Sequence, residues 1–142
     1  MIGTTLATRG AYTYTYIMKD PEYYKKRLED ERDTLLQELE RIAVPDPENP
    51  ENWILKAPDL DIMEADQNEA ADRTEEVHID SIVLDELEGR YRLILHALRK
   101  FETGTYGICE ESGAPIEEDR LDANPAARTC KKHLSATDDR AL

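Results

Sequence analysis

The feature that most constrains this chain is a run of large apolar residues with the spacing of one helix face. They recur at alternating steps of three and four, at Leu84, Leu87, Tyr91, Ile94, Leu98 and Phe101. This is the heptad seam of a coiled-coil helix. Val77 lies one heptad before the run, and Thr103-Gly104 after it is a typical helix end. Because one helix cannot bury such a seam alone, a second helix is required.

An earlier segment supplies the matching helix, predicted from Pro21 to Ala43. Asp20 is a capping residue directly before a proline at the first helical position. The apolar residues of this helix follow a heptad seam with one interruption: Tyr24, Leu28, Leu35, Leu39 and Ile42. The expected fold is therefore mainly α, with a long antiparallel coiled-coil hairpin over residues 19–103.

The connection between the two helices, residues 44–63, is predicted to be a loop. It contains four prolines, Pro45, Pro47, Pro50 and Pro58, and proline interrupts both helices and sheet ladders. Within it, Trp53, Ile54 and Leu55 are expected to fold back onto the helices as a small apolar anchor. The alternative is that Trp53 is a binding hot spot for a partner.

Residues 1–18 differ from the rest of the chain, since tyrosines alternate there with threonines and no acidic residue occurs. We expect a disordered leader. An added strand from Tyr12 to Ile17 is the alternative.

Negative charge is concentrated in the middle of the sequence. The 142 residues contain 32 acidic and 18 basic residues, a formal net charge of −14. Residues 45–90 hold 15 of the acids and three of the bases, so −12 of that charge lies there. This acidic region is either a solvated helix face or linker without a specific role, or a functional anionic surface. Direct DNA binding is not expected, because it depends on clustered lysine and arginine.

The chain also lacks an apolar stretch long enough for a membrane helix and lacks a secretory signal pattern. We therefore expect a cytoplasmic protein. In a reducing compartment, Cys109 and Cys130 are expected to be a metal-binding or packing pair and not a disulfide.

The spacing around these cysteines is that of a small metal knuckle. Cys109-x2-Ser112 is separated by 17 residues from Cys130-x2-His133. A tight turn that carries two ligands, followed by a helix start that carries two more, is how a small module closes a tetrahedral zinc site. Ser112 is the exception, because a serine hydroxyl stays protonated near neutral pH and is a poor ligand.

The chain resembles the DksA/TraR family of zinc-finger transcription factors. The resemblance rests on Gly104-Thr-Tyr-Gly-Ile-Cys109, on Arg120-Leu-Asp-Ala-Asn-Pro125 and on the knuckle spacing, and it covers roughly residues 20–138. It implies a zinc-finger-like domain at 104–142 with a short terminal helix after the hairpin. The family usually has four cysteines. Here zinc would be held by Cys109, Cys130 and His133, with Ser112 at the degenerate fourth position.

Two alternatives remain open for the knuckle. The site is empty, or the two cysteines pack in a small core with Ile108, Ile116, Leu121 and Leu134. Zinc-dependent hydrolysis is not expected, because no general base lies beside the site.

The resemblance implies that the tip of the hairpin enters the secondary channel of RNA polymerase. The family's tip pattern Asp-x2-Asp-x-Ala falls on Asp66, Glu69 and Ala71. A narrow electropositive channel would attract a slender acidic hairpin. The implied function is direct regulation of transcription by a non-enzyme. The alternative is a structural or adaptor coiled coil that has lost activity on the polymerase.

Guanosine tetraphosphate is a weaker expected partner. The resemblance places Glu86 and Leu93 where basic residues are wanted, although Arg90, Arg92, Arg99 and Lys100 remain on the same helix. His78 and His96 are expected to be ordinary surface or seam-edge residues.

Overall fold

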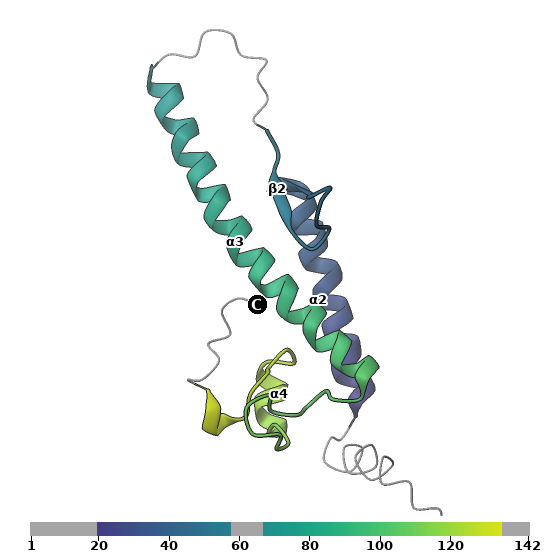
Figure 1. Ribbon diagram of the computed structural model, residues 1–142. Coiled ribbons are helices and arrows are strands. Elements are labelled where there is room, and N and C mark those ends of the chain that lie inside the picture. The colour runs from purple at the N-terminus through teal and green to yellow at the C-terminus, as the bar shows by residue number, and fades with distance from the viewer. Residues whose placement is uncertain (1–19, 58–66, 135–142) are drawn as a thin grey trace, which may run out of the picture. The chain divides into compact units, whose positions relative to one another are not determined.

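The computed structural model describes residues 20–57 and 67–134 (Figure 1). In these ranges the order is α2 (Pro21–Ile42), β1 (Ala43–Pro45), β2 (Trp53–Leu55), α3 (Gln67–Thr103), α4 (Glu118–Ala123) and the 3-10 turn η1 (Lys131–His133). The prediction of a mainly α fold is correct, with a small sheet added. The predictions for the leader 1–18, for Asp66 and for any helix after residue 134 lie outside the described residues.

Helix α2 begins and ends almost where the sequence predicts. The Asp20 carboxylate accepts hydrogen bonds from the backbone N–H groups of Glu22 (3.1 Å) and Tyr23 (3.4 Å). These N–H groups have no partner inside the helix, so the cap stabilises its first turn. Helix α3 ends at Thr103 as predicted, followed by Gly104 at φ +70°. A positive φ favours glycine, which has no Cβ to clash.

The prediction of a loop over residues 44–63 is wrong in part. Strands β1 and β2 form an antiparallel pair in which Ala43 faces Leu55 and Pro45 faces Trp53. Pro45 is tolerated because it stands at the end of a short strand, where a missing N–H removes little pairing. The turn is closed by a hydrogen bond from the Asp46 N–H to the Asn52 carbonyl (2.9 Å).

Contacts divide the described residues into two compact units, and the first consists of residues 33–57 and 67–92. Its core joins both helices and the sheet through Leu39, Ala43, Trp53 and Leu84. Trp53 is buried as an anchor, as predicted, whereas Ile54 is 48% exposed because alternate strand residues face opposite sides. Val77 is 44% exposed, whereas from Leu84 onward every residue of the predicted seam is buried or half-buried.

The second unit combines residues 20–32 with 93–134. Tyr24 and Leu28 from α2, Ile94 from α3 and Leu121 from α4 are fully or almost fully buried. The Tyr24 hydroxyl donates to the Asp122 carboxylate over 2.6 Å. Burial, together with Asp122, raises the pKa of Tyr24. This unit carries the two cysteines. None of the described helices is both long enough and apolar enough to cross a membrane.

Candidate metal centre

The first cysteine stands at the start of a tight turn. The Cys109 N–H donates to the Ala114 carbonyl (2.8 Å), and the Gly113 N–H donates to the Cys109 carbonyl (2.9 Å). Gly113 has φ +67°, which a residue with a Cβ rarely adopts. A bridge between Ile108 and Pro115 closes the base of the turn. The Cys109 side chain is buried.

The second ligand pair shares a single helical turn. Cys130 is the N-cap residue of η1, and the His133 N–H donates to the Cys130 carbonyl over 3.0 Å. The Cys130 side chain is buried, and His133 is half-buried. The cap geometry therefore turns both side chains of the Cys-x2-His motif to one side.

Cys109, Cys130 and His133 are brought together as the spacing predicts. Their ligand atoms all lie within 4.8 Å of one another. His133 Nδ1 is 3.2 Å from Cys130 Sγ and 3.7 Å from Cys109 Sγ. In a tetrahedral zinc site such atoms lie roughly 3.5–3.8 Å apart, given the usual Zn–S and Zn–N bond lengths. Two thiols and an imidazole at these distances fit zinc.

Ser112 acts on the cysteine beside it as a hydrogen-bond donor. Burial alone would raise the pKa of the Cys109 thiol, but hydrogen bonds from the Ser112 hydroxyl and from nearby backbone groups lower it to about 6. Thiolate is the form that binds metals. The Ser112 side chain therefore stabilises the ligating form of Cys109.

The alternative prediction, that the two cysteines only pack in a small apolar core, agrees with the structure in part. Ile116 and Leu121 are buried, but Leu134 is 49% exposed and contributes little. Both cysteines are free thiols.

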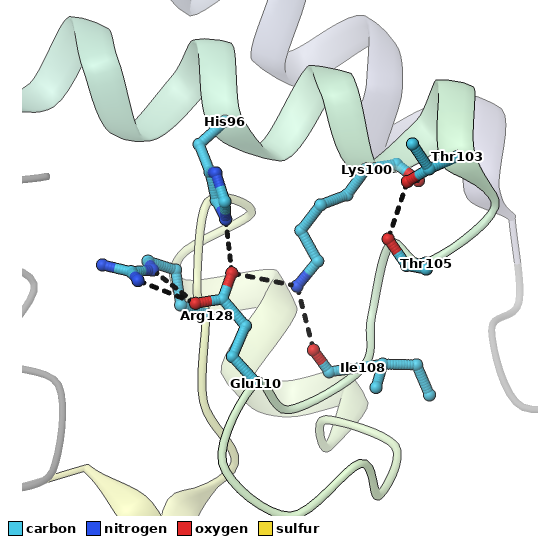
Figure 2. Close-up of polar contacts among 7 residues, drawn as sticks. All are labelled: His96, Lys100, Thr103, Thr105, Ile108, Glu110 and Arg128. Atoms are coloured by element: carbon cyan, nitrogen blue, oxygen red, sulfur yellow. Dashed lines mark hydrogen bonds and ion pairs between the residues drawn. The ribbon is translucent and has the colours of Figure 1, made fainter.

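A charged cluster next to the centre was missed by the sequence reasoning (Figure 2). One Glu110 oxygen contacts His96 Nε2 and lies 3.6 Å from Lys100 Nζ, and the other lies 2.8 Å from Arg128. Burial would raise the pKa of Glu110, but the bonds from Arg128 and His96 and the charge of Lys100 lower it. His96 and Lys100 are four residues apart on one helix face, which was the available signal. Glu110 follows Cys109 directly, so the cluster fixes the first knuckle against α3.

Comparison with known proteins agrees with this geometry. Residues 104–132 match the family model of the prokaryotic dksA/traR C4-type zinc finger. His133 lies just beyond the match, and Ser112 departs from a four-cysteine set.

Similar curated sequences match over the same short stretch. The uncharacterized protein YteA of Bacillus subtilis is 50% identical over 44 residues, 31% of this chain and 18% of that protein. The RNA polymerase-binding transcription factor DksA of Caulobacter vibrioides is 58% identical over 31 residues, 22% of each chain. The matched stretch spans no more than 33% of YteA and of the B. subtilis protein YlyA.

Solved structures match over most of the chain. Transcription factor DksA2 from Pseudomonas aeruginosa has a TM-score of 0.57 at 22% identity, over 81% of this chain and 80% of that one. The DnaK suppressor protein from Agrobacterium tumefaciens C58 has a TM-score of 0.50 at 27% identity, over 83% of this chain and 94% of that one.

The fold and the cysteine module thus define a helical protein with a small C-terminal zinc finger. Over residues 104–132 the chain is similar to the dksA/traR C4-type zinc finger, and its fold is similar to those of DksA2 and of the DnaK suppressor protein. Zinc is the metal that this family description indicates and that the two thiols and the imidazole fit.

Proposed function

We propose that this protein is a transcription regulator that binds RNA polymerase directly. The observation that carries the proposal is the combined match of the finger and of the fold to DksA proteins, one of which is named as an RNA polymerase-binding transcription factor. The protein acts by binding and not as an enzyme. Its expected place of action is the cytoplasm, where the polymerase works.

We further propose that residues 19–103 form a coiled-coil hairpin whose tip enters the secondary channel of the polymerase. Glu69 and Ala71 belong to the first turns of α3, directly after Asp66 in sequence. Helix α3 has 37 residues, about 55 Å at 1.5 Å per residue. That length suits a deep channel, and the −12 charge of residues 45–90 would be drawn towards a positively charged one.

The finger, residues 104–142, would dock the hairpin on the polymerase surface. Cys109, Cys130 and His133 would hold zinc, with Ser112 supporting Cys109. The metal would supply a structural cross-link between the two ligand turns. Guanosine tetraphosphate remains a secondary candidate ligand, because Glu86 is acidic and Leu93 is buried where the family resemblance requires basic residues.

The test is co-purification with RNA polymerase followed by transcription in vitro. Wild-type protein should be retained by the polymerase and should change transcript yield. The Asp66→Asn, Glu69→Gln double variant should still bind but should lose most of its effect on transcription. Glu75→Gln, Glu76→Gln is the matched control, because both residues are exposed acids farther along the same helix.

Two outcomes would contradict parts of the proposal. Failure of the wild type to bind polymerase would remove the function itself. Binding with no change in transcription by wild type would favour the alternative of an adaptor coiled coil, to which the Ser112 and Glu69 departures also point. A DNA-binding finger would instead be retained on DNA and released by salt.

A further inference from the structure

The metal centre has three strong protein donors for four tetrahedral positions. The ligand atoms of Cys109, Cys130 and His133 lie within 4.8 Å of one another, and no further histidine, cysteine or acidic residue in the described part of the chain joins them. Ser112 stands where a second cysteine of the first turn would supply the fourth donor. Zinc sites with three protein donors keep the remaining position for an external ligand.

The Ser112 hydroxyl is already engaged by the protein. It donates a hydrogen bond to Cys109 and accepts one from the Ala114 N–H over 3.3 Å. A neutral hydroxyl also competes poorly with a thiolate for zinc, which soft sulfur ligands suit. Ser112 therefore supports the turn and its cysteine, and it leaves the fourth position to a stronger donor.

The position beside Ser112 is accessible from solvent. Both cysteines are buried, so the protein covers the sulfur side of the centre. The turn residues 111–114 are all exposed, Lys132 in the second motif is exposed, and His133 is half-buried. A small molecule can thus approach the centre from the side of the first turn without unfolding the finger.

We propose that the fourth position of this centre takes the thiolate of a small thiol. A third sulfur beside Cys109, Cys130 and His133 completes the three-sulfur, one-nitrogen donor set that closes many structural zinc sites. The thiol releases its proton to solvent on binding, and no electron is transferred. Because such a ligand binds the folded finger, the stability of the finger would rise with thiol concentration. The proposal rests on metal binding by these three residues and is independent of polymerase binding.

The test replaces zinc by Co²⁺, whose absorption spectrum reports the donors around the metal. The full chain with one equivalent of Co²⁺, kept reduced by a phosphine at constant concentration, is titrated with 2-mercaptoethanol. The sulfur-to-cobalt absorption should rise by about half and then saturate, as two thiolate donors become three. Ethylene glycol, in which a hydroxyl replaces the thiol, is the control ligand and should cause no change.

Ser112→Cys is the matched variant, because it supplies the third sulfur from the chain itself. It should show the larger absorption without added thiol and should not respond to 2-mercaptoethanol. Ser112→Ala should respond as the wild type does, because the hydroxyl that it removes is not the ligand. Circular dichroism checks that each variant is folded, and metal analysis after each titration checks that the cobalt is retained.

The proposal would be overturned by a wild type that ignores the thiol while Ser112→Cys shows the larger absorption, since the chain itself would then close the site. Equal responses of the wild type and Ser112→Cys, a response to ethylene glycol, or loss of cobalt to the thiol would also overturn it. A wild type that takes up no cobalt would remove the metal centre as well. None of these results bears on polymerase binding, which co-purification measures separately.

Discussion

The two ends of helix α3 differ sharply in how many of their residues are buried. Between Leu93 and Lys100 the helix buries four residues, Leu93, Ile94, Ala97 and Lys100. Between Ala71 and Val83 its described residues are exposed or half-buried, and Val77, Ile79, Ile82 and Val83 are exposed. Of these four exposed residues only Val77 lies on the predicted seam, and the seam position between Val77 and Leu84 is occupied by Asp80. This part of the helix therefore has no continuous apolar face to bury.

The largest expected difference between the two ends of α3 is in how fast their backbone amides exchange once the metal is lost. Cys130→Ala removes one ligand, and we expect zinc content to fall from about one equivalent to near zero, because the remaining donors are too few for a closed site. Hydrogen exchange should then speed up over residues 93–103 and 104–134, while residues 71–83 exchange as before. Lys132→Ala is the control in the same turn. Full zinc content in folded Cys130→Ala would exclude the three-ligand site.

The next largest expected difference is in the free energy of unfolding, measured by chemical denaturation, when an apolar side chain is shortened at each end of α3. Ile94 is 0% exposed, so Ile94→Ala should lower the free energy of unfolding by about 2–5 kcal/mol. Val77→Ala removes apolar atoms from an exposed position of the same helix and should change it by less than about 0.5 kcal/mol. Similar losses for both variants would mean that the first half of α3 is also packed.

The smallest expected effect concerns pH and Ser112 in the metal-free chain. The folded-state pKa of Cys109, about 6, lies below the ordinary thiol value of 9.0. The thiolate therefore stabilises the folded state fully above about pH 9, and this contribution is lost as the pH falls through about 6. Ser112→Ala should raise the pKa of Cys109, measured by thiolate absorbance, because a donor is removed.

The control for this measurement is Glu111→Gln, which changes a side chain but keeps the backbone N–H that faces Cys109. An unchanged pKa in Ser112→Ala would show that the backbone groups alone hold the thiolate.

Much of this fold could be predicted because its signals are local. The caps, the heptad spacing and Thr103-Gly104 place both helices, and two Cys-x2 motifs bring Cys109, Cys130 and His133 together. The β1–β2 pair was missed because three-residue strands containing Pro45 have almost no periodic signal. The contact of His96 with Glu110 was missed because it depends on the path of the chain between them, which neither residue's neighbours specify.

Lys100 holds the end of α3 and the start of the finger at the same time. Its backbone carbonyl accepts the N–H groups of Thr105 (2.8 Å) and Tyr106 (3.1 Å), while its side chain reaches the carbonyl of Ile108. A chimera that grafts this finger onto another helix at residue 104 would lose these bonds. The transferable part therefore starts before Lys100, and an exchange of fingers between relatives should carry the last turns of the helix with it.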